Sequence, residues 1–301
     1  MKMKLTKPLL VLSLGFAMSC GNPQSGETPA DTTAQDSIAQ AVTESPTAPT
    51  ADKNPDGIGG LYVGSFDAVE YNEKKKPSYN NKITVSIDSV LAGTLYGHSI
   101  VAGNMRPFTG AAKQEGKVYT VTVKEPGDDQ YDGSFEFKIY SDLDSINGTW
   151  TANKKSLAVT KRQFALSKRE FKYDPNLELP DYLPRNELYS EKNMPEEEYG
   201  NYEAMTDDVL KVNASKVLLK KSDVENMHKG DLEVIRNAIY ARHGYSFKNR
   251  RMRYVFDSSV DWYIPLYTDV RDKLTEVERK NADLLKRYEA HAAKYYDAYG
   301  R

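Results

Sequence analysis

The central part of the chain, from Leu61 to about Phe171, alternates apolar and polar side chains with a period of two residues. Successive side chains of a strand point to opposite faces of a sheet, so this period predicts strands with one buried face. Three segments show it most clearly, with the apolar members Ile83, Val85 and Ile87, then Tyr119, Val121 and Val123, then Phe135, Phe137 and Ile139. Residues 58–171 are therefore predicted to form a β domain.

Turn-forming residues separate these segments. Asn, Asp, Gly and Pro adopt the backbone angles that tight turns require, so neighbouring strands are expected to join as hairpins. A meander of about eight short strands can close into an antiparallel barrel. The predicted turns lie at Asn80-Asn81, Gly116, Pro126-Gly127-Asp128, Asp132-Gly133 and Asn147-Gly148.

Two glycine-containing segments lie near the ends of this domain, Gly60-Leu61-Tyr62-Val63-Gly64 and Gly148-Thr149-Trp150. Their layout resembles that of small lipocalin-like barrels. The resemblance implies a ligand inside the barrel. A barrel this small can equally be filled by its own side chains, so a packed interior is the alternative.

The N-terminus has the pattern of an export signal. Residues 1–7 include three lysines, and an apolar run from Leu9 to Met18 follows that is too short to span a bilayer. Ser19-Cys20 resembles the junction of a bacterial lipoprotein signal, although Ala17 stands where leucine is usual. The resemblance implies that residues 1–19 are removed and that a lipid on Cys20 holds the protein to a membrane. Gly21 follows Cys20, and glycine rather than aspartate at this position resembles the sorting signal of outer-membrane lipoproteins. The resemblance implies an anchor in the outer membrane, with the protein on its periplasmic or its surface face.

Composition divides the rest of the chain. Residues 20–57 are rich in Pro, Ser, Thr and Ala, too poor in apolar side chains to fold, and are predicted to be a disordered tether. Residues 172–214 form an acidic, proline-containing connector, with eleven acidic and four basic side chains between residues 171 and 214. Residues 215–301 hold eighteen basic and thirteen acidic side chains. An acidic connector thus lies next to a basic domain, and the two are expected to attract each other.

Within this last domain, a helix is predicted from Leu232 to His243, with Asp231 as its N-cap and Gly244 closing its C-terminus. Its apolar face includes Arg242. A buried guanidinium needs a partner, so Arg242 is expected either to pair with a carboxylate or to reach water. The candidate partners are Asp257, Asp261 and Glu278.

The same helix carries the run Tyr240-Ala241-Arg242-His243-Gly244, and this run resembles the signature of the YARHG domain, a module of exported bacterial proteins. The resemblance extends over roughly residues 215–290 and includes Trp262-Tyr263-Ile264-Pro265 and Leu274-Thr275. It implies a small all-α domain and an exported protein. It transfers no catalytic residue.

Basic side chains form the candidate binding site of this domain. Arg242 and His243 together are a candidate anion site, with a structural ion pair and a capping histidine as the alternative. Four more cations follow at Lys248, Arg250, Arg251 and Arg253. They predict a solvated face, a dock for the acidic connector, or a site for anionic envelope polymers such as lipid head groups and acidic glycans.

Motifs of enzymes are absent from the sequence: it has no nucleophile elbow, no phosphate-binding glycine loop and no His-Glu-x-x-His. No catalytic residue, metal or cofactor is predicted, because His98 lacks neighbouring ligands and Cys20 is the only cysteine. Nucleic acid is not an expected partner, given the exported context and a pI near 6.2.

The sequence therefore predicts an α+β protein, a β domain followed by a helical one, that binds or assembles with another envelope component and is not an enzyme. Two alternatives stand beside this prediction. One is a hydrolase of envelope polymers that uses His243, and the other is a lipocalin-like carrier of a small apolar ligand.

Overall fold

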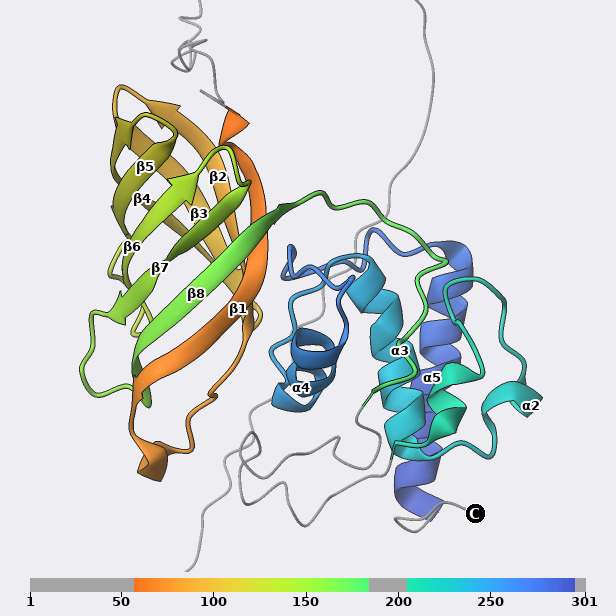
Figure 1. The fold of residues 1–301 in the computed structure, drawn as a ribbon. Coiled ribbons are helices and arrows are strands. Elements are labelled where there is room, and N and C mark those ends of the chain that lie inside the picture. Colours follow the sequence, from red (N-terminus) through yellow and green to blue (C-terminus); the bar gives the residue numbers. More distant parts are fainter. Residues whose placement is uncertain (1–56, 184–204, 296–301) are drawn as a thin grey trace, which may run out of the picture. The chain divides into compact units, whose positions relative to one another are not determined.

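The structure is a computed structural model, and it describes residues 57–183 and 205–295. An antiparallel β-barrel comes first and a group of helices follows (Figure 1). This arrangement confirms the predicted α+β class. Cys20, the predicted signal peptide and all of the tether but Gly57 lie outside the described residues.

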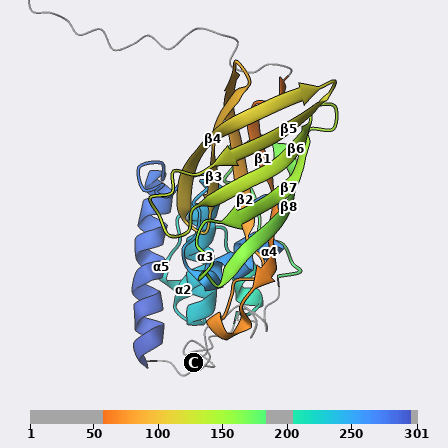
Figure 2. The same cartoon turned by 90° about the vertical axis from the view of Figure 1, so that its left-hand side faces the viewer.

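The barrel has eight strands, each hydrogen-bonded to the next along the chain, and β1 closes it by pairing with β8 (Figures 1 and 2). Adjacent strands are antiparallel throughout, as the predicted hairpins require. The strands are β1 (Gly60–Tyr71), β2 (Lys82–Leu91), β3 (Thr94–Val101), β4 (Asn104–Glu115), β5 (Val118–Lys124), β6 (Gly133–Tyr140), β7 (Ser145–Ala152) and β8 (Val159–Arg169). A short 3-10 helix, η2 (Glu73–Lys75), follows β1.

The interior of the barrel is built from the alternating apolar residues. All nine side chains named for the three clearest strands are buried. Aromatic rings fill the centre: the ring of Phe66 lies 6.0 Å from Trp150, 6.2 Å from Phe164 and 6.4 Å from Phe135. Aromatic side chains bury a large area each, so these rings contribute much of the hydrophobic stabilisation of the barrel.

Strand β2 departs from the prediction of one buried face. Thr84 and Ser86, on its polar side, are buried as well. The reason is a second apolar layer outside the barrel, where Val63 of β1, the register partner of Thr84, packs on Ile264 and Leu266 of the helical region. The alternation of apolar and polar side chains could not predict this layer. Alternation indicates the face of the sheet on which a residue lies, but it does not indicate which other element covers that face.

The hairpin turns were predicted with mixed success. Gly116 lies in a turn, but Asn147-Gly148 was wrongly assigned, since both residues are inside β7. The β6–β7 turn at residues 141–144 was missed, and so were the turns at Ala92-Gly93 and Ala102-Gly103, where all four residues have positive φ. Alanine disfavours that backbone region, so the alanines hid the last two turns from prediction.

The helical region has a hydrophobic core of its own, to which Ile239 and Phe256 contribute. Helices α3 and α5 pack side by side (Figure 1). No helix among the described residues has the length and apolar character needed to cross a membrane. The elements are η4 (Asp207–Leu210), α2 (Lys221–Val224), α3 (Lys229–Arg242), α4 (Arg250–Ser259) and α5 (Glu276–Tyr295).

Helix α3 begins three residues earlier than predicted, at Lys229, and its N-cap is His228 rather than Asp231. Asp231 is buried in the first turn, where its carboxylate accepts hydrogen bonds from the backbone N–H and the hydroxyl of Thr206. This contact fastens the chain before η4 to α3. A capping box lies at the start of α5, since Thr275 and Glu278 exchange side-chain-to-backbone hydrogen bonds.

Part of the predicted connector belongs to the helical core. Leu183, Met205 and Val209 are all buried in it, so this core begins before residue 215. Residues 184–204 lie outside the described residues. Residues 171–183, which lead from β8 into the helical region, are called the linking segment below.

Polar contacts join the barrel to the helical region. The Nζ of Lys82 donates to the carbonyls of Val260 and Tyr263, and its backbone N–H donates to Asp257. The backbone N–H of Gly103, in the β3–β4 turn, donates to Ser246 Oγ at 2.9 Å. Both barrel residues lie at strand ends, so these contacts place one end of the barrel against residues 246–263 of the helical region.

Candidate functional site

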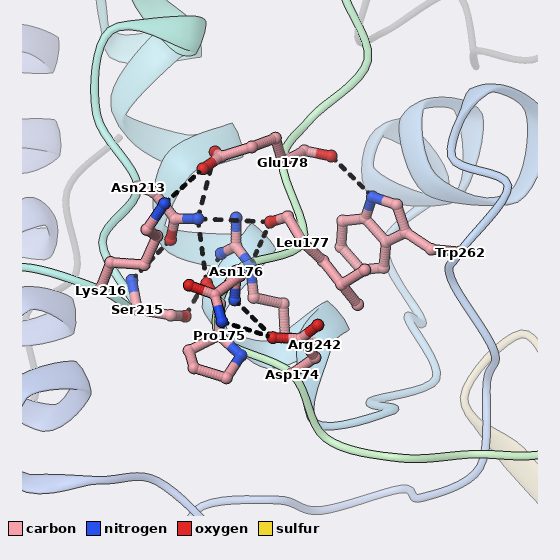
Figure 3. A network of polar contacts seen from close by, with 10 residues as sticks. All are labelled: Asp174, Pro175, Asn176, Leu177, Glu178, Asn213, Ser215, Lys216, Arg242 and Trp262. Atoms are coloured by element: carbon pink, nitrogen blue, oxygen red, sulfur yellow. Dashed lines mark hydrogen bonds and ion pairs between the residues drawn. The ribbon is translucent and has the colours of Figure 1, made fainter.

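Arg242 lies beneath the linking segment and is only 2% exposed. Its Nε donates to the carbonyl of Leu177 at 2.8 Å, and its Nη1 donates to Ser215 Oγ at 3.3 Å (Figure 3). The indole ring of Trp262 lies 5.7 Å from the guanidinium carbon. Burial lowers the pKa of Arg242 to about 10, against the opposing attraction of Glu178 and Glu278. The guanidinium therefore keeps its charge at neutral pH.

The prediction of a carboxylate partner for Arg242 is wrong, because the three candidates have other partners. Asp257 accepts from the backbone of Lys82, and Asp261 accepts from the hydroxyl of Tyr182. Glu278 lies 2.8 Å from His243. The backbone of the linking segment takes the place of the expected carboxylate, and a partner of this kind leaves no signal in side-chain composition.

The side chains around Arg242 hold the same segment. Asn213 Nδ2 donates to the carbonyls of Pro175 and Leu177, and Trp262 Nε1 donates to the carbonyl of Glu178 at 2.7 Å (Figure 3). Pro175, Leu177 and Glu178 thus offer their main-chain oxygens to the helical region. Buried backbone oxygens need such partners, so this network fixes the path of the chain out of the barrel.

His243 is held in a second buried contact with this segment. Its Nε2 lies 2.8 Å from Glu278 Oε2, its ring stacks on Tyr173 at a centroid distance of 4.2 Å, and the Tyr173 hydroxyl donates to Glu278 Oε1 at 3.1 Å. Glu278 Oε2 also accepts from the backbone N–H and the hydroxyl of Thr275. Burial would raise the pKa of Glu278, but the hydrogen bonds from His243, Thr275 and Ser215 outweigh it and lower the pKa to about 2. An ionised Glu278 accepts only, so the proton of the contact is on His243 Nε2.

The motif residues therefore form a closed structural cluster. His243 is 4% exposed and Glu278 is fully buried, and their polar atoms are directed at each other and at the linking segment. Gly244 adopts positive φ as the predicted C-terminal residue, and Ala241 is in the core. Tyr240 packs against the core and its ring lies 6.2 Å from that of Tyr245.

The six predicted anion-binding residues do not share one site. Arg242 and His243 lie under the linking segment as described. Arg251 donates to Glu233 at 3.2 Å, and Arg250 donates to the carbonyls of Lys76 and Pro77 in the β1–β2 connection. Lys248 and Arg253 alone among the six line a cavity at one end of the barrel.

This mouth cavity has a volume of about 450 Å³. One part of its wall is apolar and includes Phe66, Phe135, Trp150 and Leu157. Another part of the wall is basic and includes Arg162, Lys248 and Arg253. The remaining lining residues are Ser78, Asn81, Ser99, Val101, Ala102, Asn104, Arg106, Glu125, Tyr131, Ala158 and Val159.

Arg162 of β8 is the most buried cation in this lining, at 7% exposed. Its Nη1 donates to the carbonyl of Phe66 at 2.8 Å, its Nη2 donates to the carbonyl of Ser78 at 2.8 Å, and the guanidinium lies 5.1 Å from the centre of the Phe66 ring. Burial and then the nearby charge of Arg253 lower the pKa of Arg162 to about 10, with Asp67 opposing. Arg162 is thus charged and close to a second cation.

Arg253 of α4 faces it from the helical region. Its Nη1 donates to the carbonyl of Lys248, and its Nε is buried with no hydrogen-bond partner among the described residues. Burial lowers the pKa of Arg253, against the attraction of Asp257. A buried N–H without an acceptor costs free energy, so this group favours an acceptor from a bound molecule.

Residues 209–290 match the model of the YARHG domain family. This region is a YARHG domain. It contains the motif run 240–244 together with Lys248 and Arg253, and it begins inside η4, before the predicted boundary at residue 215. No curated protein matches the chain.

Another part of the lining of the mouth cavity belongs to the barrel alone and includes the acidic Glu125 and the basic Arg106. Glu125 is buried and accepts from Ser99 Oγ, from the backbone N–H of Gly133 and from Trp150 Nε1. Burial raises the pKa of Glu125, with the hydrogen bonds from Trp150 and Gly133 opposing. Arg106 pairs with Asp132 at 3.1 Å. The excess positive charge is therefore at Arg162 and at the two cations of the YARHG domain.

Arg162 was not predicted as a site residue. It lies in β8, where the alternation of apolar and polar side chains predicts only a strand. Among the residues that the structure describes, no cluster of His, Cys, Asp and Glu has the arrangement of a metal site. His98 is on β3 and lies 3.0 Å from Asp88, so it has a carboxylate partner that sequence neighbourhood did not reveal.

Proposed function

We propose that this protein is a non-enzymatic binding protein of the bacterial envelope, anchored by lipid on Cys20, whose mouth cavity takes a small amphipathic anion. An amphipathic anion here means an apolar molecule with one carboxylate, phosphate or sulfate group. The proposal develops the carrier alternative of the sequence analysis and adds a charge to its ligand.

The observation that carries the proposal is the pair of guanidinium groups at the cavity. Arg162 and Arg253 repel each other, and neither has a carboxylate within ion-pair distance among the described residues. Charges removed from water are costly unless an opposite charge compensates them. An anion between the two groups would supply that compensation, and it would also offer an acceptor to the Nε of Arg253.

The apolar wall supports a ligand with an apolar body. Phe66, Phe135 and Trp150 belong to the same lining as the cations. The cavity volume of about 450 Å³ falls in the range of small-molecule sites, which runs from about 300 to 1,000 Å³. A hydrated inorganic anion would not use the apolar part of the lining, so an amphipathic molecule fits the lining better.

The position of His243 argues against the hydrolase alternative. A general base must come within hydrogen-bond reach of its substrate. The Nε2 of His243 is bonded to Glu278, and Tyr173 covers one face of the ring. A polymer would reach this histidine only after displacing the linking segment.

The membrane anchor rests on the sequence pattern around Cys20. We expect Cys20→Ala to block processing of the precursor and to abolish labelling with radioactive palmitate. Labelling that persists in the variant would refute the anchor and leave the cavity proposal unaffected.

Isothermal titration calorimetry of the mature chain with decanoate tests the cavity. We expect one molecule of decanoate per chain. The matched alcohol, decanol, and inorganic phosphate should each bind at least about tenfold more weakly, because each lacks one half of the ligand, and tenfold corresponds to about 1.4 kcal/mol. Equal binding of decanoate and decanol would refute recognition of the anion.

Arg162→Met should weaken decanoate binding about tenfold or more while leaving decanol binding unchanged. The control is Arg251→Met. It removes a cation that is close to Arg253 in the sequence but does not line the cavity, since Arg251 pairs with Glu233. Arg162→Lys keeps the charge and tests whether a folding defect explains the loss. Unchanged affinity in folded Arg162→Met would contradict the proposed site.

A further inference from the structure

The two cations of the YARHG domain reach the mouth cavity only because that domain contacts the end of the barrel. We infer that the YARHG domain supplies half of the anion site, so that a bound anion fastens the YARHG domain to the barrel. The inference rests on the proposed function and deepens it: Arg253 and Lys248 become binding residues, and the position of the helical domain becomes sensitive to the ligand.

The β3–β4 turn sets the position of Lys248. Gly103 has a φ of 73°, its N–H donates to Ser246 Oγ, and a Cβ placed on it would lie 2.1 Å from Lys248 Cγ and 3.0 Å from the Lys248 backbone nitrogen. The turn and residues 246–248 are therefore in direct contact, with no room for a methyl group. Glycine at position 103 permits both the turn and this approach.

The same contact positions Arg253. Lys248 carries the carbonyl that accepts from Arg253 Nη1, so a shift of residues 246–248 away from the turn would carry the guanidinium with it. Arg162, in contrast, is bonded to carbonyls of the barrel alone. The distance between the two guanidiniums thus depends on how the domains are docked.

The contacts at this junction include one repulsion. Arg250 donates to two carbonyls of the β1–β2 connection, and Lys82 donates to two carbonyls of the helical segment. These contacts attract, whereas Arg162 and Arg253 repel across the cavity. An anion held by both would turn that repulsion into two attractions. Thermodynamic linkage then requires docking and binding to strengthen each other by the same factor.

Gly103→Ala tests this coupling with a matched control, Gly116→Ala. Both glycines have positive φ in hairpin turns, at 73° and 62°, so both substitutions impose a similar backbone strain. A Cβ on Gly116 meets nothing within 4 Å, while one on Gly103 meets Lys248. The difference between the two variants isolates the contact with the YARHG domain. Ser246→Ala, which removes the docking hydrogen bond without strain, is a second disrupting variant.

Two measurements on the mature chain are needed, the dissociation constant for decanoate and amide hydrogen exchange. We expect Gly103→Ala and Arg253→Met each to weaken decanoate binding about tenfold, Ser246→Ala to weaken it severalfold, and Gly116→Ala to leave it unchanged. Decanoate should slow exchange in residues 246–253 as well as in the β3–β4 turn, and Arg162→Met should abolish the slowing in both.

The outcomes separate the inference from the proposed function. If Arg162→Met weakens binding but Arg253→Met, Gly103→Ala and the exchange of residues 246–253 show no effect, the site lies in the barrel alone: the inference fails and the proposed function stands. If decanoate does not bind the parent chain, both fail.

Discussion

Arg242 and Arg162 are two buried arginines with similar local contacts and different surroundings. Each donates to at least one backbone carbonyl, each lies over an aromatic ring, and burial lowers the pKa of each to about 10. Arg242 is enclosed by the linking segment, and the carboxylates nearest to it attract it. Arg162 faces a cavity and a second guanidinium.

The comparison shows why a buried charge in a recognisable motif is poor evidence for a binding site. The cluster around Arg242 and His243 uses its hydrogen-bonding groups to fix the exit of the chain from the barrel. The cluster around Arg162 combines two guanidinium groups that have no ion pair among the described residues with open volume. Compensation of the charge, and not burial alone, distinguishes a structural cluster from a candidate site.

Replacement of Glu278 should have the largest effect on stability. Glu278→Leu leaves the N–H of His243 and the hydroxyls of Tyr173 and Thr275 without their acceptor in a buried place. We expect a loss of about 3–5 kcal/mol in the free energy of unfolding, measured by chemical denaturation. Glu276→Gln, an exposed change in the same helical turn, should have no measurable effect. Similar losses in the two variants would show that the motif cluster is not the closed structural unit described above.

Arg242→Met should cause the second largest loss in the free energy of unfolding. Methionine keeps most of the packing volume but removes the donors to Leu177 and Ser215. A loss of about 2–3 kcal/mol is expected, together with faster proteolysis of the linking segment. The exposed Arg271→Met is the control. An unchanged unfolding curve for Arg242→Met would mean that the linking segment is held without this arginine.

The pH dependence of stability gives a third test of the same cluster. The pKa of Glu278 falls from an ordinary 4.5 to about 2 on folding, so its contribution is fully present above about pH 4.5 and is lost as the pH falls towards 2. We expect about 2–3 kcal/mol of stability to disappear in this window. Glu278→Gln should flatten the curve there. If wild type and variant lose stability in parallel between pH 4.5 and 2, the lowered pKa is not what stabilises the cluster.

Arg162→Met should have the smallest effect on stability of the variants compared here. It removes donors to Phe66 and Ser78, but it also removes the repulsion with Arg253, and the two effects offset each other. We expect a net change of about 1 kcal/mol or less in the free energy of unfolding without ligand. A loss as large as that of Arg242→Met would make Arg162 a second structural arginine.

The barrel could be predicted from the sequence because alternation encodes which face of a strand is buried. Ile83, Val121 and Phe137 all point inward as expected. The helix with Arg242 could be predicted for the same kind of reason, from spacing and from Gly244 at its end. The elements that cover the outward face of a strand could not be predicted. Thr84 is an example, because it lies on the polar side of β2 and is nevertheless buried.

The candidate site was out of reach for a different reason. Arg162 and Arg253 are 91 positions apart in the chain and meet only through the docking of two domains. Lys248 and Arg253 were nominated as basic side chains, but their neighbours Arg250 and Arg251 carried the same signal and have partners elsewhere. Charge composition marks a basic segment, and only the fold decides which of its members face a cavity.

Decanoate titrations of Arg242→Met and Arg162→Met, at a temperature where both are folded, test the central claim most directly. The account predicts that Arg242→Met, although much less stable, binds decanoate with the affinity of the parent chain, and that Arg162→Met loses about tenfold or more in affinity at nearly unchanged stability. Loss of affinity in Arg242→Met with full binding in Arg162→Met would contradict it, and would place the anion at the motif.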